Sequence, residues 1–89
     1  MTEIAKYLQI LKQQKEFSSY FKIAKFLGVS ASYIYEVKRT GKLSDKKCII
    51  IADKLNLEPL EIIAARNCDN AKDMMSRAFW SKVHYKYKK

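Results

Sequence analysis

The chain has 89 residues and a formal net charge of +9, with 48% hydrophobic residues, two cysteines and one histidine. This length provides for one small domain, and the hydrophobic fraction is too high for a disordered chain. No apolar run approaches the roughly 18 residues that a membrane span needs, and the N-terminus lacks the features of a signal peptide. So small a chain leaves little room for a catalytic cleft, so we expect that it is not an enzyme and does not bind membranes.

The cysteines and the histidine give no sign of a metal site. Cys48 and Cys68 are 20 residues apart, with no neighbouring Cys or His pattern. In a chain without a signal peptide, such a pair indicates two reduced thiols in the cytoplasm. Cys48 lies in an apolar run and is expected in the core, whereas His84 is expected to be solvated in a basic tail. We therefore expect a cytoplasmic protein with no cofactor and no metal.

The positive charge is concentrated at the C-terminus. Residues 74–89 hold five Lys and Arg and no acid, which is more than half of the net charge. A surplus of this kind favours a polyanionic partner, nucleic acid first and a membrane surface second. Composition alone leaves open whether the charge serves binding or solubility.

Apolar residues recur every three or four positions through most of the chain, which predicts helices. A first helix begins after Thr2 as its N-cap. A short second helix begins after a serine of the pair at positions 18 and 19. It ends at Gly28, because glycine adopts the left-handed conformation of a helix end at no steric cost. The predicted inner faces of these two helices consist of Ile4, Tyr7, Leu8, Leu11, Phe21, Ile23, Ala24 and Leu27.

Three further helices follow the first two. Ser30 and Ser44 are the predicted N-caps of the third and fourth helices, and Pro59 fits the first position of the fifth. Thr40 to Lys42 is predicted to be a turn. The predicted inner faces of these helices consist of Ile34, Val37, Cys48, Ile51, Ala52, Leu55, Leu60, Ile63 and Ala64.

A polar run from Asn67 to Asn70 predicts a break before a last helix, which spans Ala71 to about Tyr85 and leads into a frayed basic tail. Three uses of the apolar stripe on this last helix are open: folding back on the core, a dimer interface, or a membrane surface. The first two are favoured, and the tail after position 83 is expected to stay unburied and to add non-specific DNA affinity. The stripe, a dimer or fold-back face, consists of Met74, Met75, Phe79 and Val83.

The segment 20–39 combines two short helices with a tight turn at Gly28, and Ala24 is small enough for the helices to cross closely. An apolar wedge fixes the angle between them. It consists of Ile23, Leu27, Val29, Ile34 and Val37. These residues resemble the helix-turn-helix of the lambda-repressor/Cro-like (XRE-type) family, and residues 43–63 resemble its fourth and fifth helices. The resemblance covers residues 4–65.

The resemblance implies a fold and a division of the chain. It implies an all-α, compact five-helix bundle that binds operator DNA, to which this chain adds a basic C-terminal helix. We expect residues 1–66 to be the helix-turn-helix DNA-binding domain, and residues 67–89 to be a basic amphipathic helix and tail.

The resemblance also implies contact residues, with the third helix in the major groove. Several family members carry Gln at the starts of the second and third helices, where this chain has Tyr20 and Ala31, so the operator is not predictable. The expected base contacts are Ala31, Ser32, Tyr35, Glu36 and Arg39. The expected phosphate contacts are Ser18, Ser19, Tyr20, Lys22, Tyr33, Lys38 and Lys42.

These features predict a sequence-specific regulator of transcription that binds double-stranded DNA as a homodimer, a repressor of phage, mobile-element or antitoxin type. The alternative is a helical protein-interaction module that binds a protein partner through its C-terminal helix. Because the chain has no sensor domain and no obvious effector pocket, we expect its own concentration to set its occupancy on DNA.

Overall fold

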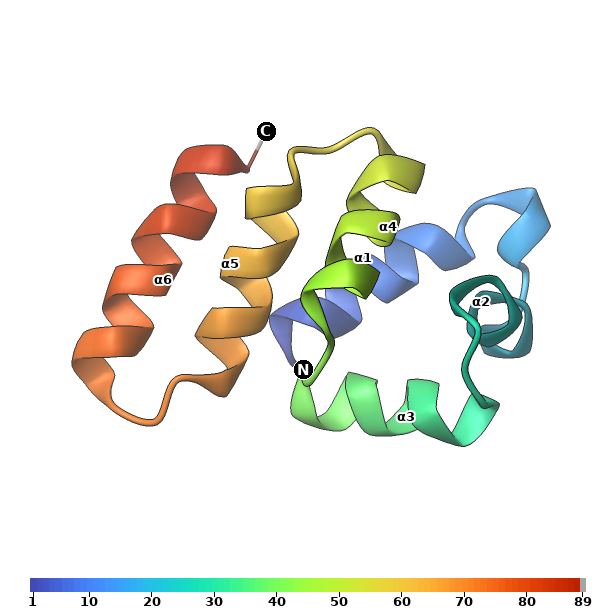
Figure 1. The fold of residues 1–89 in the computed structure, drawn as a ribbon, viewed down its shortest axis with the longest axis horizontal. Helices are drawn as coiled ribbons and strands as arrows, with labels where there is room; N and C mark the ends of the chain where they lie inside the picture. The colour runs from blue at the N-terminus through green and yellow to red at the C-terminus, as the bar shows by residue number, and fades with distance from the viewer. Residues whose placement is uncertain (89) are drawn as a thin grey trace.

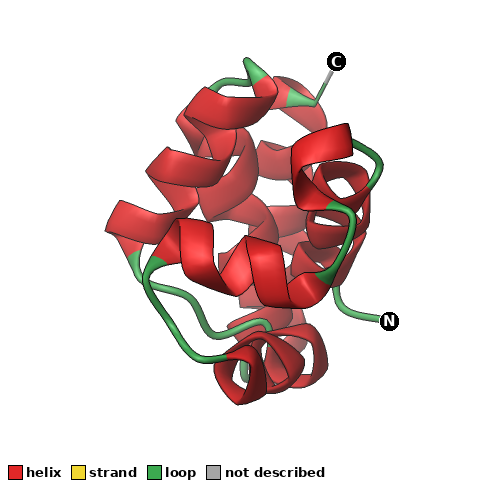
Figure 2. Cartoon of the chain, turned by 90° about the vertical axis from the view of Figure 1, so that its right-hand side faces the viewer, coloured by secondary structure: helices red, strands yellow, loops and turns green. Residues whose placement is uncertain are grey.

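Helices make up most of the chain in this computed structural model, which describes residues 1–88. Short loops join the helices, and the described residues contain no strand (Figure 2), so the predicted all-α class is confirmed. The elements are α1 (Glu3–Lys12), the short 3-10 helix η1 (Lys15–Phe17), α2 (Tyr20–Leu27), α3 (Ala31–Thr40), α4 (Asp45–Leu55), α5 (Pro59–Asn70) and α6 (Met74–Tyr87).

The predicted caps and ends of α1 to α4 and the predicted start of α5 are confirmed, whereas α6 begins at Met74 and not at Ala71. Each of the four expected caps accepts a hydrogen bond from the backbone N–H three residues further on, which satisfies a donor that the helix itself leaves unpaired. These caps are Thr2, Ser19, Ser30 and Ser44. Gly28 and Gly41 end α2 and α3 in the left-handed conformation, and Pro59 is the first residue of α5.

The core lies among α1 to α5, with α2 and α6 toward opposite ends of the long axis (Figure 1). Its fully buried side chains are Ile4, Leu8, Leu11, Ile23, Ile34, Cys48, Ile51 and Ile62. Cys48 is a free thiol in this core, as expected, and burial raises its pKa to about 11. The predicted inner positions Phe21 and Leu60 are wrong, because both side chains are exposed.

The predicted break at residues 67–70 is also wrong. These residues form the last turn of α5, which passes through the domain boundary expected at residue 66, and the chain leaves the helix only at residues 71–73. The run is polar because two of its side chains, those of Asp69 and Asn70, form hydrogen bonds with the ends of other helices. Asp69 accepts from the backbone N–H of Glu3 at 2.8 Å and of Ile4 at 2.9 Å. A carboxylate there suits the positive end of the α1 dipole.

We call the meeting point of α1, α3 and α5 the three-helix junction. Besides Asp69, it contains Asn70, whose side-chain amide donates to the carbonyl of Gly41 at 3.1 Å. It also contains Thr2, whose hydroxyl donates to the carbonyl of Lys38 at 2.8 Å. The start of α1, the end of α3 and the end of α5 are therefore held together by side chains that bond to backbone groups.

Helix α6 folds back along α5 (Figure 1). It does so on a face that the apolar stripe does not predict, because Met74, Met75 and Phe79 remain 89%, 83% and 56% exposed. Among the four stripe residues only Val83 is half-buried. The side chains withdrawn from solvent are Ser76, Trp80, Val83, His84 and Tyr87.

The C-terminal part of α6 contradicts two further expectations. The tail is helical as far as Tyr87, and His84 is buried rather than solvated. Its Nε2 lies 2.6 Å from the hydroxyl of Tyr7, and that hydroxyl donates to Glu61 at 2.5 Å. We call these three residues the Tyr7–Glu61–His84 cluster. A buried polar cluster thus holds the end of α6 against α1 and α5. The basic residue Lys89 lies outside the described residues.

Alanine at the two helix-ending glycines should have unequal effects. Both have φ near +70°, but a Cβ at Gly28 would meet nothing within 4 Å, whereas at Gly41 it would lie 2.5 Å from the Cβ of Asp69. We expect Gly28→Ala to lower the free energy of unfolding by about 1 kcal/mol and Gly41→Ala by roughly 2 to 4 kcal/mol. Urea unfolding monitored by circular dichroism measures both. Equal losses would show that the three-helix junction does not constrain position 41.

Acidification should weaken the protein through His84. Burial lowers the pKa of His84, opposed by the carboxylates of Glu3 and Glu61 and assisted by the charges of Lys88 and Lys6. A lowered pKa means that the unfolded chain binds the proton first, so stability is full above about pH 6.5 and falls below it. The slope cannot exceed about 1.4 kcal/mol per pH unit for one proton.

Thermal unfolding between about pH 7.5 and 5.5 measures this effect. His84→Gln keeps a donor for Tyr7 but does not titrate, so its melting temperature should change less with pH than that of the wild type. An identical pH dependence in the two proteins would assign the effect to other groups.

Candidate nucleic-acid interface

The turn between α2 and α3 is built by backbone geometry. Gly28 has φ +73°, and the N–H of Val29 bonds back to the carbonyl of Ala24 at 2.9 Å, which closes the end of α2. Ser30 then caps α3 by accepting from the N–H of Tyr33 at 3.1 Å. Three residues, 28–30, thus suffice to turn the chain and start the next helix.

The apolar wedge beneath this turn is formed as predicted. Ala24 is 2% exposed, which agrees with the need for a small residue where α2 and α3 cross. Ile23, Ile34 and Val37 are also buried, and Val29 is half-buried. The buried side of α3 is therefore fixed, which determines the side that faces solvent.

Four of the five expected base-contact residues lie on that outer side, opposite Ile34 and Val37, whereas Ala31, three residues before Ile34, lies at its border. Ala31 is half-buried, and the other four are exposed. We call this surface the α3 outer face; it consists of Ala31, Ser32, Tyr35, Glu36 and Arg39. It is a continuous polar and aromatic strip along one helix.

Two residues of the α3 outer face are paired with each other. The guanidinium of Arg39 donates from Nε to Glu36 Oε1 at 3.0 Å and from Nη2 to Glu36 Oε2 at 2.9 Å. Both side chains are largely exposed, so the pair contributes little to stability. It does engage the donors of Arg39 with a carboxylate, and any ligand that uses those donors must displace Glu36.

A cluster of rings and lysines lies beside the α3 outer face. The ring of Tyr20, at the start of α2, meets the ring of Tyr35 edge to face, with 5.9 Å between centroids. The ammonium group of Lys38 lies 4.1 Å from the Tyr20 centroid and that of Lys12 lies 4.5 Å from it. We call these four residues the Tyr20 cluster. It brings together side chains from α1, α2 and α3.

The remaining expected phosphate contacts are distributed around α2 and α3. Ser18 and Lys22 are joined by a side-chain hydrogen bond of 3.2 Å, next to the capping hydroxyl of Ser19. The three residues therefore gather at the N-terminus of α2. Tyr33 is exposed on the first turn of α3, and Lys42 is exposed just after its end.

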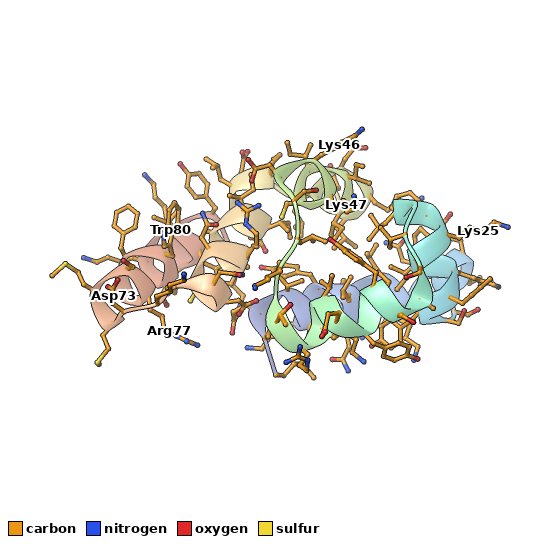
Figure 3. The ribbon with its side chains drawn as sticks, turned by 60° about the horizontal axis from the view of Figure 1, so that its bottom comes forward. Lys25, Lys46, Lys47, Asp73, Arg77 and Trp80 are labelled. Atoms are coloured by element: carbon orange, nitrogen blue, oxygen red, sulfur yellow. The ribbon has the colours of Figure 1, made fainter. Side chains whose placement is uncertain are left out.

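The structure adds two cations that the sequence did not point to. Lys12 belongs to the Tyr20 cluster, although its position at the end of α1 gave no sign of this. Arg77 projects from α6 (Figure 3) and lines a shallow depression together with Lys38 and Arg39, to which Glu3 and Asp69 also contribute. Arg77 was expected only in the basic C-terminal segment. Only the packing of α6 on α5 brings it to the end of α3.

The other labelled lysines in Figure 3 lie elsewhere on the molecule. Lys46 and Lys47 are on the first turn of α4, and Lys25 extends from α2.

None of the helices within residues 1–88 combines the length and apolar character needed to cross a bilayer. No protein-family model matches the sequence, and comparison with curated proteins and with solved structures gave no match.

Proposed function

We propose that the protein is a sequence-specific, double-stranded DNA-binding regulator of transcription, a repressor of phage, mobile-element or antitoxin type. In this proposal α1 to α5 are a lambda-repressor-like bundle, and α2 and α3 are its helix-turn-helix. The observation that carries the proposal is the α3 outer face, a polar strip opposite the buried side of α3 and bordered by the Tyr20 cluster. A helix exposed in this way can enter the major groove.

The residues around α3 divide into two roles. Ser32, Tyr35 and Arg39 are aimed at base edges, and Ala31 can contact a thymine methyl group. Lys12, Lys38 and Lys22 supply charge for the phosphates, together with the N-terminus of α2 and its serines. Arg77 extends this basic border onto α6. Part of the C-terminal charge therefore contributes to DNA affinity.

The Glu36–Arg39 pair gives the α3 outer face a built-in selectivity. When Arg39 leaves Glu36 to bind guanine, its guanidinium exchanges the two carboxylate oxygens of Glu36 for the acceptors O6 and N7 of the base. On a site without guanine at that position, Arg39 stays with Glu36 and is withheld from the phosphates. The wrong sequence therefore gains no contact from Arg39, whereas the correct sequence does.

The test uses a duplex selected from a random pool and a scrambled duplex of the same length. Arg39→Ala should weaken binding to the selected duplex by about 10-fold or more and binding to the scrambled duplex much less, because a bidentate base contact is worth about 1–3 kcal/mol. Fluorescence anisotropy at several salt concentrations measures both affinities and their salt slopes.

Two companion variants control this experiment. Glu36→Gln should bind the scrambled duplex more tightly than the wild type, since it removes a negative charge from the surface and releases Arg39. Lys6→Ala, which changes charge on α1 next to Glu3, should leave the preference for the selected duplex unchanged. If the wild type binds both duplexes equally, or binds neither at low salt, the regulator proposal is wrong.

The exposed stripe on α6 supports dimerisation. Met74, Met75 and Phe79 form an apolar surface, and methionine and aromatic residues are enriched in protein interfaces. A homodimer would double the number of base contacts, which one α3 helix supplies only in small number. The alternative function uses the same surface for a different protein.

Replacing Phe79 by Glu should convert a dimer into a monomer, because it places a charge in the proposed interface. Light scattering on the purified protein measures the mass. Phe21→Glu is the matched control, since Phe21 is 67% exposed on α2 and lies outside this surface. A monomeric wild type, or a dimer that Phe79→Glu leaves intact, would reject the homodimer and favour a protein partner for this face.

A further inference from the structure

Two lysines share the ring of one tyrosine beside the α3 outer face. The ammonium group of Lys38 lies 4.1 Å from the Tyr20 centroid, and that of Lys12 lies 4.5 Å from it. The two positive charges are therefore no more than about 9 Å apart, which is close to the screening length of physiological salt. Their mutual repulsion is unfavourable in the free protein, and a bound anion relieves it.

No carboxylate neutralises these two charges. The ion pairs within residues 1–88 involve other cations, and neither Lys12 nor Lys38 takes part in one. Glu36, the acid on the α3 outer face, is held by Arg39. The partner of the two lysines is instead an aromatic ring, which attracts an ammonium group through its quadrupole and carries no net charge. Lys12 and Lys38 therefore keep their attraction for phosphate.

The ring of Tyr20 is fixed by the bundle. Tyr20 is the first residue of α2, and its half-buried side chain packs against the core. Its ring also meets that of Tyr35 edge to face. Lys12 and Lys38 come from the ends of α1 and α3, so the fixed ring gives two long side chains a common support. Ordering them before DNA arrives lowers the entropy that is lost on binding.

The two lysines line different depressions in the surface. Lys12 lines one with Tyr20 and with Gln9 and Gln13 of α1, whose amides are donors for phosphate oxygens. Lys38 lines the depression that Arg77 also lines, at the end of α3. Tyr20 thus supports two cations that serve two separate places beside α3. This arrangement fits successive phosphates of a DNA strand better than one small anion.

We propose that Tyr20 is a positioning residue, whose ring holds Lys12 and Lys38 ready for phosphates of the DNA backbone. The inference rests on the proposed function and changes the role expected of Tyr20, because the ring is required and the hydroxyl is not. The ring raises affinity for every duplex through the two lysines. Glu36 has the opposite effect, since its carboxylate reserves Arg39 for the correct sequence.

Tyr20→Phe and Tyr20→Leu form a matched pair, because the first keeps the ring without the hydroxyl and the second keeps only an apolar side chain. Anisotropy with the selected and the scrambled duplex should show wild-type affinities for Tyr20→Phe. Tyr20→Leu should bind both duplexes about 5-fold or more weakly, since it loses two cation–π contacts. In a protein that already carries Lys12→Gln and Lys38→Gln, Tyr20→Leu should have no further effect.

Proton NMR of the DNA-free protein tests the ring contacts directly. The ring current of Tyr20 should shift the side-chain methylene protons of Lys12 and Lys38 upfield in the wild type and in Tyr20→Phe, and this shift should be lost in Tyr20→Leu. Unshifted lysine protons in the wild type would overturn the inference even if Tyr20→Leu does not fold.

The binding data separate this inference from the proposed function. A wild type that binds no duplex rejects both. If the wild type binds DNA and Tyr20→Leu binds it equally well, only the role of Tyr20 is wrong. Equal weakening by Tyr20→Phe and Tyr20→Leu would assign the effect to the hydroxyl and would also overturn the inference, as would a full further loss from Tyr20→Leu in the protein without the two lysines.

Discussion

The cap that Asp69 places on α1 is the interaction on which the rest of the arrangement depends. One carboxylate at the end of α5 accepts from the first two N–H groups of α1, and its side chain packs where a Cβ on Gly41 would lie. Without it, two N–H groups at a helix start would lose their partner, at a cost of about 1–3 kcal/mol each if they stay buried. Asn70 and Thr2 extend the same contact to the end of α3. The position of α3, and with it the α3 outer face, is thus set from behind by α5.

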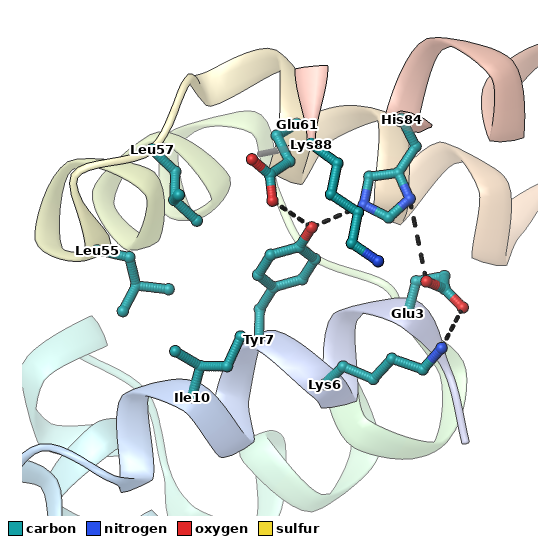
Figure 4. A pocket seen from close by; sticks show the side chains of 9 residues that line it. All are labelled: Glu3, Lys6, Tyr7, Ile10, Leu55, Leu57, Glu61, His84 and Lys88. Atoms are coloured by element: carbon teal, nitrogen blue, oxygen red, sulfur yellow. Dashed lines mark hydrogen bonds and ion pairs between the residues drawn. The ribbon is translucent and has the colours of Figure 1, made fainter. Parts of the chain in front are cut away.

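A second polar contact, the Tyr7–Glu61–His84 cluster, holds α6. An apolar face would attach a helix through non-directional burial, whereas these hydrogen bonds specify one position for its end. The consequence is that the methionines and Phe79 are left outside, where they are available to a partner. The same cluster lines a cavity between α1, α5 and the end of α6 (Figure 4). The face on which α6 packs therefore determines both the exposed stripe and this cavity.

Local signals predicted the parts of the structure that local chemistry controls. The caps Thr2, Ser19, Ser30 and Ser44 and the glycine at position 28 were identifiable because each acts on backbone groups within a few residues. The outer side of α3 followed from the periodicity of Ile34 and Val37. The predicted burial of Leu60 and the predicted packing face of α6 were wrong, because an argument from periodicity assumes that polar side chains face water. Glu61 and His84 are polar but buried against a partner from α1.

The sequence by itself determined that this protein is helical, where most of its helices begin, and which side of α3 faces outward. Only the tertiary structure decided that residues 67–70 continue α5, that Lys12 and Arg77 lie near α3, and that His84 is buried. The physical reason is the range of the interactions. Caps and turns depend on neighbours within four residues, whereas Asp69 meets Glu3 across 66 positions and His84 meets Tyr7 across 77. The sequence places the C-terminal charge only along the chain, and the packing of α6 on α5 decides which surface of the molecule carries it.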